Sequence, residues 1–174
     1  MGHLNVLKGA YPSLSQLDET LPVKSGVTAI ERGSALVKDS DEWKLTDHTT
    51  DVDGGATGTP GPIVYFALQD QDDPDVQMAG NKLTALPCIA PCEIETDQYS
   101  GTPAVGKYLR AGDAGKVTLL DTDGETAIGM CTKAATYRWS NNDGPNAGFP
   151  GERTGGRIQA IAFWTCYLPE VTAL

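Results

Sequence analysis

Residues 116–132 read Lys116-Val-Thr-Leu-Leu120, Asp121-Thr-Asp-Gly124, Glu125 and Thr126-Ala-Ile-Gly-Met-Cys-Thr132. Two runs that favour extended backbone flank a turn sequence, in which Asp and Gly tolerate positive φ angles. The stretch therefore predicts a strand, a tight turn and a return strand, paired as a β-hairpin.

The same pattern recurs on both sides of this hairpin. A second hairpin is predicted around Arg32-Gly33, and the longest strand pattern, 157–168, lies near the C-terminus. No segment has the 3.6-residue period of an amphipathic helix longer than about two turns. Many short strands with a turn signal about every ten residues predict an all-β fold, a small β-barrel or sandwich of antiparallel strands. The other predicted strands are 43–46, 62–68, 82–86, 92–96, 104–109 and 135–139.

The first 26 residues differ from the rest. Their apolar residues keep no sustained period, and Pro12 and Pro22 interrupt any regular element. We interpret residues 1–26 as an extended N-terminal arm that is too apolar to float free, and residues 27–174 as the β-barrel-like domain. The alternative is that the first 26 residues form a strand and loop folded onto their own domain.

Composition excludes several classes of partner. The chain has 174 residues, 40% of them apolar, which suffices for a real core. Its formal charge of −10 repels phosphate backbones and anionic membrane surfaces, so no nucleic acid or membrane partner is expected. No apolar run is long enough to span a bilayer, and the N-terminus lacks the pattern of an export signal. We therefore expect a protein that is made and used without export and that docks on basic surfaces.

Acidic turns are the first candidates for chemistry. Residues 70–75 carry four Asp, and 121–125 resemble the opening of a calcium loop. Such a loop needs a Glu at its twelfth position, which here is Thr132. Turn formation explains both segments, so no metal site is predicted.

Cysteine and histidine offer no stronger site. Cys88 and Cys92 form the one close cysteine pair, and structural zinc usually needs a second. All four cysteines have apolar or small neighbours and are expected to be buried, reduced thiols. His3 and His48 lack the setting of a catalytic base. We expect no catalytic residue, no cofactor and no enzyme activity.

The order of segments from residue 27 onward resembles that of small capsid decoration (cement) proteins of tailed bacteriophages. The resemblance is a succession of strand and turn segments over about 145 residues and contains no catalytic motif. Its segments are Ile30-Glu-Arg-Gly-Ser-Ala-Leu-Val37, Trp43-Lys-Leu-Thr46, Ile63-Val-Tyr-Phe-Ala-Leu-Gln-Asp70, Leu83-Thr-Ala-Leu-Pro87, Ile94-Glu-Thr-Asp-Gln-Tyr99, Val105-Gly-Lys-Tyr-Leu-Arg-Ala-Gly-Asp113 and Ala127-Ile-Gly-Met130.

The resemblance implies a structural virion protein that is made in the host cytoplasm. Such a protein binds the outer surface of the capsid as a homotrimer at local three-fold positions, contacts the major capsid protein and stabilises the expanded shell by bridging capsomers. An N-terminal arm commonly contributes to contacts with the shell or a neighbour. The candidate arm residues are Leu4, Val6, Leu7, Tyr11, Leu14 and Leu17.

A subunit interface is predicted near the C-terminus. Residues 158–168 are apolar on both faces of the expected strand, which is typical of a buried or interface strand. The candidate interface residues are Phe163, Trp164 and Tyr167. Two other functions stay open: a receptor- or glycan-binding module of a phage fibre or spike, and a small β-barrel enzyme with a carboxylate mechanism.

Overall fold

The computed structural model describes most, but not all, of the chain. The described residues are 2, 4–9, 18–27, 29–47, 63–87, 92–120, 126–133 and 158–167. For residues 5–9, 92, 159 and 161–167 the description is limited to the backbone.

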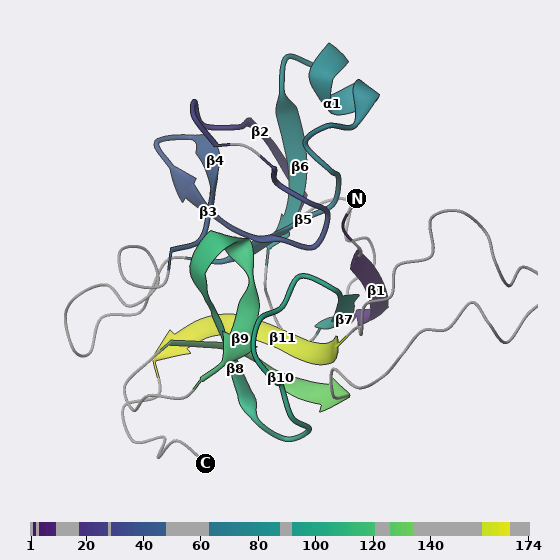
Figure 1. Cartoon of the computed structure of the whole chain (residues 1–174), viewed down its shortest axis with the longest axis vertical. Coiled ribbons are helices and arrows are strands. Elements are labelled where there is room, and N and C mark those ends of the chain that lie inside the picture. Colours follow the sequence, from purple (N-terminus) through teal and green to yellow (C-terminus); the bar gives the residue numbers. More distant parts are fainter. Residues whose placement is uncertain are drawn as a thin grey trace, which may run out of the picture.

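One sheet has six strands in the order β1-β7-β11-β10-β8-β9, and every neighbouring pair is antiparallel. Figure 1 shows this sheet in the lower half of the molecule, with β1 beside β7 at its edge. Its strands are β1 Leu4–Gly9, β7 Cys92–Thr96, β8 Tyr108–Ala111, β9 Val117–Leu119, β10 Thr126–Lys133 and β11 Ile158–Tyr167.

The other sheet has five antiparallel strands in the order β2-β6-β5-β3-β4. It curls so strongly that its two edges meet at one parallel bridge between Val23 and Trp43, where the Lys24 amide donates to the Trp43 carbonyl over 2.9 Å. The strands are β2 Glu19–Pro22, β3 Ala35–Asp39, β4 Glu42–Leu45, β5 Tyr65–Ala67 and β6 Lys82–Pro87.

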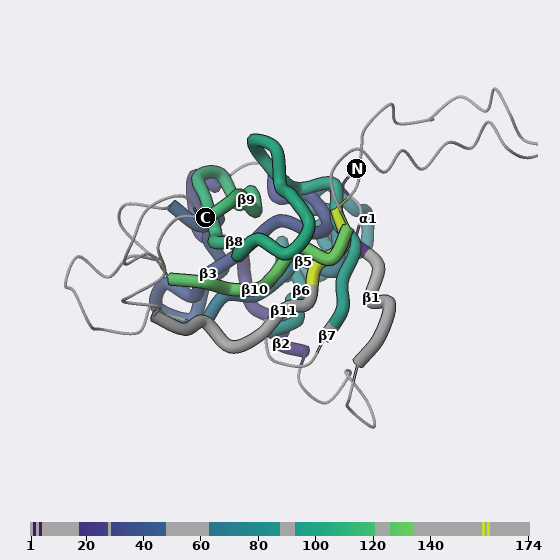
Figure 2. The backbone as a smooth tube through the Cα atoms, turned by 90° about the horizontal axis from the view of Figure 1, so that it is seen from below, coloured from purple at the N-terminus to yellow at the C-terminus, as the bar shows by residue number. Residues whose placement is uncertain are grey.

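These two sheets confirm the all-β fold of antiparallel strands. The bridge between Val23 and Trp43 is isolated and not a ladder, so the barrel is not closed, and the two sheets form a sandwich. Seen from below, β8, β9 and β10 lie in front of the strands of the five-stranded sheet (Figure 2).

The curl gives the five-stranded sheet two buried faces. The outer face packs on the six-stranded sheet, where Phe66 of β5 meets Ile94 of β7 and Ile128 of β10 in one core cluster. The inner face encloses a second cluster around Trp43 and Leu83, and neither of these side chains is exposed to solvent. Strands buried on both faces need apolar residues at consecutive positions, as in Tyr65-Phe-Ala67.

Trp43 is the centre of the inner cluster. Its indole Nε1 donates a 2.7 Å hydrogen bond to the Leu83 carbonyl, and its ring lies 4.8 Å from that of Tyr65, centroid to centroid. One end of the cluster is covered by the short helix α1 (Pro74–Met78) through the buried Val76. The Asp73 side chain caps α1 by accepting from the Asp75 amide. Because Trp43 is enclosed, it cannot stack on a glycan.

The predicted hairpin of residues 116–132 is wrong in its pairing. Both strands form, as β9 and β10, but β8 lies between them. Leu109 of β8 is opposite Leu119 of β9 on one side and Gly129 of β10 on the other. The alternation of residue types predicts which face of a strand is buried, whereas the partner at each edge depends on the rest of the chain.

The predicted hairpin around Arg32-Gly33 is also wrong. A turn does form there, with the Ser34 amide donating to the Glu31 carbonyl over 2.9 Å, but residues 29–31 are not a strand. Ala29 has a φ of 66°, a value that a strand does not tolerate. The hairpin that forms instead joins β3 to β4 through Ser40 and Asp41, whose φ angles of 54° and 64° suit a two-residue turn.

Wherever residues 1–26 are described, they belong to the two sheets and do not form a separate extended arm. Residues 4–9 form β1 in one sheet and residues 19–22 form β2 in the other. Leu4 and Val23 are core residues, with 1% and 7% of their surfaces exposed. The alternative, a strand and loop folded onto their own domain, therefore describes these segments. Burial of apolar side chains is the physical reason, since a free arm would leave them in water.

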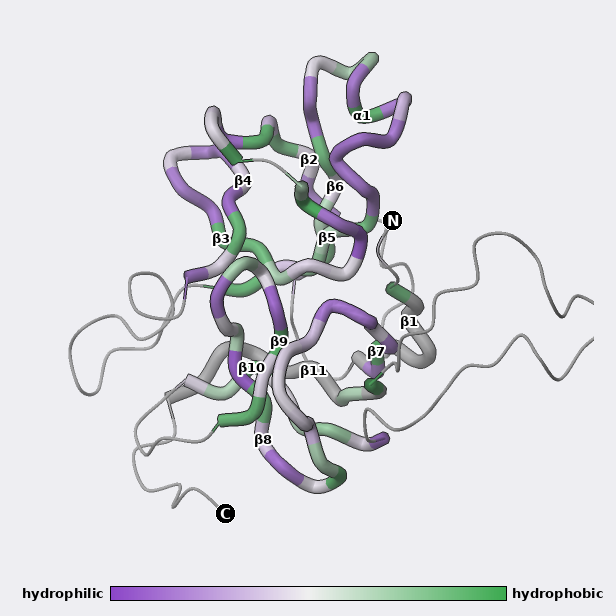
Figure 3. Tube along the Cα trace, in the orientation of Figure 1, coloured by the Kyte–Doolittle hydropathy of each residue, from purple (hydrophilic) through white to green (hydrophobic). Residues whose placement is uncertain are grey.

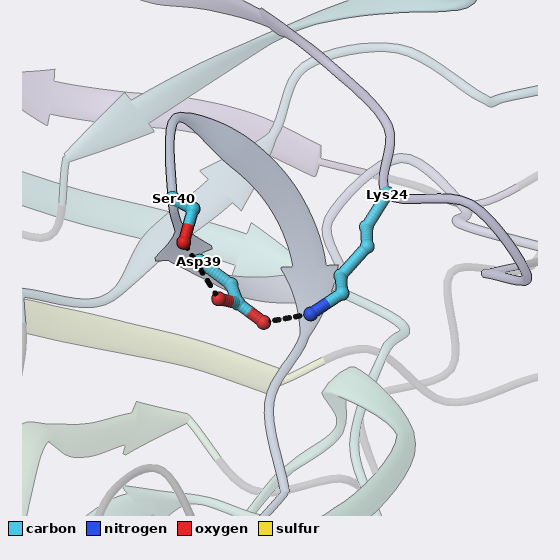
Figure 4. A network of polar contacts seen from close by, with 3 residues as sticks. All are labelled: Lys24, Asp39 and Ser40. Atoms are coloured by element: carbon cyan, nitrogen blue, oxygen red, sulfur yellow. Dashed lines mark hydrogen bonds and ion pairs between the residues drawn. The ribbon is translucent and has the colours of Figure 1, made fainter.

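Two ion pairs join β2 and the residues after it to the hairpin of β3 and β4. Lys24 pairs with Asp39, whose carboxylate also accepts from the Ser40 hydroxyl (Figure 4). Lys38 pairs with Glu19 and lies 5.3 Å from the centroid of the Tyr65 ring. The hydrogen bond from Lys24 lowers the pKa of Asp39, and the hydrogen bond to Glu19 raises the pKa of Lys38.

The Lys24–Asp39 pair predicts a dependence of stability on acid. The folded protein holds the pKa of Asp39 below its ordinary value of 3.8, so the stabilisation is present above that value and is lost as the pH falls through the folded pKa. In Asp39→Asn, the melting temperature should fall less steeply between pH 5 and pH 2 than in the wild type. Asp72→Asn, at an exposed position, is the control, and equal slopes for Asp39→Asn and the wild type would contradict the prediction.

Candidate functional site at the N-terminal strand

The N-terminal strand β1 carries the predicted contact residues, so its attachment to the domain decides what it can do. β1 pairs with β7 along its length, from Leu4 opposite Thr96 to Gly9 opposite Cys92, with an irregularity between Val6 and Lys8. Among the described strands, β7 is its one partner and β1 is an edge of the sheet. Edge strands are the usual sites at which another chain adds to a sheet.

The Asp70 carboxylate anchors the residues before β1. Its Oδ1 accepts hydrogen bonds from the amide of Gly2 over 2.7 Å and from the amide of Arg32 over 2.9 Å. This places Gly2 tightly against the Arg32 backbone: a Cβ on residue 2 would lie 2.0 Å from the Arg32 carbonyl oxygen. The site therefore accepts glycine at position 2 and no larger residue without moving the chain.

Leu4 is the first apolar contact after this anchor. Its side chain joins the core cluster between the two sheets, which also contains Ile94 of β7 and Ile158 of β11. Leu4 is therefore buried in its own domain in this conformation, and its contact with the shell or a neighbour stays a prediction. Val6 and Leu7 lie in β1 with only their backbone described, and Tyr11, Leu14 and Leu17 lie outside the described residues.

Removing the Asp70 anchor should loosen β1. Asp70→Ala deletes the acceptor of two backbone amides, and hydrogen bonds to charged groups are worth about 1.5–3 kcal/mol each where water is excluded. Because Arg32 is exposed, we expect a total loss of about 1–3 kcal/mol in the free energy of unfolding. Amide hydrogen exchange of residues 4–9 should accelerate more than that of β3. Unchanged exchange in β1, or the same change in the control Asp72→Ala, would contradict the assignment of Asp70 as an anchor.

The predicted interface residues Phe163, Trp164 and Tyr167 belong to β11. Residues 158–162 of β11 pair with β7 on one side, and β10 pairs with β11 as far as Tyr167. Beyond Ala162, the described strands therefore flank β11 on one side alone. The side chains of Phe163, Trp164 and Tyr167 lie outside what is described, so their assignment to a subunit interface stays a prediction.

A polar cluster missed by the sequence analysis joins the two halves of the domain. Gln98 follows β7 and is 3% exposed. Its amide Nε2 donates to Glu31 Oε2 over 3.2 Å and to Asp97 Oδ1 over 2.8 Å, and its Oε1 accepts from the Lys116 ammonium. Glu31 precedes β3 of the five-stranded sheet, whereas Lys116 precedes β9 of the six-stranded sheet, so the cluster links the sheets. No sequence motif marks such long-range contacts.

The acidic turn at 70–75 has structural roles. Asp70 holds Gly2 and Arg32, and Asp73 caps α1. Figure 3 shows hydrophilic stretches of chain around α1. Within the described segments, no three His, Cys, Asp or Glu side chains gather closely enough to hold a metal ion. The second acidic turn, 121–125, lies outside the described residues.

Cys131 is buried and reduced, as predicted, and burial raises the pKa of its thiol. Its Sγ donates a 3.1 Å hydrogen bond to the Lys133 carbonyl. The side chains of the other three cysteines, and both histidines, lie outside what is described. In the parts of the chain that are described, no helix combines the length and apolar character needed to cross a bilayer.

Comparisons with known proteins add no relative. No protein-family model, no curated protein and no solved structure matches the chain.

Proposed function

We propose that the chain is a structural subunit of a tailed-phage virion. In this proposal it decorates the outer surface of the capsid as a homotrimer at local three-fold positions, contacts the major capsid protein and bridges capsomers of the expanded shell. The observation that carries the proposal is the resemblance in segment order, since each resembling segment contains or overlaps a strand of one sandwich. These strands are β3, β4, β5, β6, β7, β8 and β10.

Hydrogen bonds between the two sheets suit a subunit that must keep its shape under the stress of the shell. Gln98, Glu31 and Lys116 link the two sheets, and the Thr46 hydroxyl donates a 2.8 Å hydrogen bond to the Gly112 carbonyl between them. A cement protein needs no turnover. It needs a body that keeps its shape while many weak contacts, multiplied by the symmetry of the shell, add up to tight binding.

The surface charge supports docking on basic patches. The chain has a formal charge of −10, and the exposed residues Asp72 and Asp75 lie just before α1 and in its first turn, near Met78, which is 86% exposed. Attraction between exposed charges is screened within about 8–10 Å at ordinary salt concentrations. Binding to shells should therefore weaken as salt rises.

The decisive experiment is the copy number on particles from the native source, measured by quantitative mass spectrometry. About one copy per major capsid subunit supports a cement that covers the lattice. A few copies per particle would overturn it in favour of the fibre or spike module, to be examined on glycan arrays. Absence from particles would remove both proposals and leave the carboxylate-dependent enzyme.

A binding assay tests the acidic surface separately. Purified protein is added to shells that lack it, and occupancy is measured against concentration. Asp72→Asn/Asp75→Asn should bind several-fold more weakly than the wild type at low salt, and high salt should remove the difference. Asp41→Asn/Glu42→Gln changes the net charge equally at the β3–β4 turn and is the matched control. Equal loss in both double variants would assign the effect to net charge rather than to this surface.

A further inference from the structure

We propose that β1 is exchanged between copies, so that residues 4–9 of one chain pair with β7 of a second chain. The partner is therefore another copy of this protein, and the receiving site is the edge of β7 with the core position filled by Leu4. The inference deepens the homotrimer of the proposed function and rests on that self-association, but not on binding to a capsid.

The receiving site is shaped for this strand. The β7 edge holds β1 in a defined antiparallel register, the core between the sheets takes the Leu4 side chain, and Asp70 binds the amide of Gly2. The Arg32 carbonyl oxygen excludes any side chain at position 2. A strand with a different sequence would lose the glycine fit, the buried leucine or both. These contacts are the same whether β1 comes from its own chain or from a neighbour.

The connection of β1 to the domain allows exchange. β1 and β2 are consecutive strands but belong to different sheets, so β1 makes no ladder with its neighbour in sequence. Eight residues, 10–17, separate Gly9 from Asp18. Fully extended, a chain of that length reaches about 26–29 Å, several times the spacing of about 4.8 Å between neighbouring strands.

Concentration decides between the closed and the exchanged form. Because the contacts are unchanged, the closed form is favoured mainly by the effective concentration that the short connection gives β1, which is in the millimolar range for short linkers. Exchange should therefore compete at about 1 mM chain and vanish at about a hundredth of that concentration. Copies held side by side on a lattice would meet the same condition, and a closed ring satisfies every strand and every receiving edge.

A single substitution makes the exchange visible in the full chain. Gly9 is opposite Cys92 in the β1–β7 register. Opposed residues of antiparallel strands have Cα atoms about 4.5 or 5.5 Å apart, within the range of about 4.4–6.8 Å that a disulfide bridges. In Gly9→Cys, a disulfide to Cys92 would lie within one chain in the closed form and between chains in the exchanged form. Denaturing gels without reductant distinguish the two.

We expect oxidation at about 1 mM chain to link roughly half or more of the crosslinked molecules into covalent dimers or trimers, and oxidation at about a hundredth of that concentration to give linked monomers. Gly9→Cys/Cys92→Ser is the control, because any multimers it forms come from disulfides that do not involve position 92. Linked monomers alone at both concentrations would overturn the exchange. Failure to form any link to Cys92 would overturn it too, because β1 would then not lie on β7.

A second measurement needs no new cysteine. Wild-type chains grown in heavy and light isotopes are mixed at about 1 mM, fixed with a chemical crosslinker at that concentration and examined by mass spectrometry. Mixed oligomers should appear, and they should appear several-fold faster with Asp70→Asn, which weakens the anchor that must open, than with Asp72→Asn. Monomers alone, or equal rates in the two variants, would contradict exchange through β1. If the protein is present on particles but shows no exchange, the exchange of β1 is wrong and the proposed function stands. If it exchanges β1 but is absent from particles, the proposed function is wrong and the exchange stands.

Discussion

Trp43→Ala should lower the free energy of unfolding by about 3–5 kcal/mol, the largest effect expected from a single side chain. Trp43 is fully buried inside the curled sheet and packs against Tyr65. Its removal leaves a cavity that the surrounding strands cannot fill, and it frees the Leu83 carbonyl from its bond to the indole. Urea unfolding followed by circular dichroism would measure the loss.

Two further variants make this prediction specific, one at the same position and one at an exposed position. Trp43→Phe keeps an aromatic ring but loses the indole donor, so its effect should lie between the wild type and Trp43→Ala. Met78→Ala removes a side chain that is 86% exposed and should change the stability by no more than about 0.5 kcal/mol. A loss below about 1 kcal/mol for Trp43→Ala would mean that the inner core is not organised around this residue.

Leu4→Ala is expected to cost about 2–5 kcal/mol, because a leucine that is 1% exposed leaves a cavity between the two sheets when it is truncated. The loss should be largest in and around β1, since Leu4 joins this strand to the common core. Native-state hydrogen exchange is the suitable measurement. It should show β1 and its partner β7 opening at lower free energy, while β3 in the five-stranded sheet changes less.

The control for Leu4 is Val105→Ala, at an apolar position that is 62% exposed, which should be nearly neutral. The difference between the two variants also decides how a deletion of the N-terminal strand should be interpreted. Deletion of residues 2–20 removes β1 and the first two residues of β2, so loss of particle binding by that deletion would not separate docking from unfolding. If Leu4→Ala is as neutral as Val105→Ala, β1 is not part of the core and the interpretation of residues 1–26 as an extended arm is again favoured.

Much of the secondary structure could be predicted from the sequence. The run at 82–86 alternates between apolar and polar residues and forms β6, and the run at 92–96 forms β7. The Asp-Ser-Asp-Glu turn at 39–42 joins β3 to β4 as its residue types indicate. In each case the signal is local, because side-chain alternation and turn chemistry act over a few residues.

The candidate site could be predicted only in part. The apolar content of residues 1–26 indicated that the segment does not float free, yet the sequence could not say whether Leu4 is buried in its own domain or in a neighbour. The sequence places Asp70 in an acidic turn but gives no sign of its hydrogen bond to Gly2, which lies 68 positions away in the chain. The Gln98–Glu31 bond spans 67. No local pattern contains such pairs, because they depend on how distant segments pack.

By itself, the sequence determined that this protein is all-β and where most of its strands lie, because side-chain alternation follows directly from the geometry of extended backbone. It did not predict β1 or β2, and residues 29–31, which it predicted as part of a strand, do not form one. The tertiary structure decided which strands pair. It placed β8 between β9 and β10, curled the five-stranded sheet until Val23 met Trp43, and laid β1 on β7. Backbone amides and carbonyls are the same in every strand, so edge pairing is chosen by the fit of side chains across the whole core rather than by any one segment.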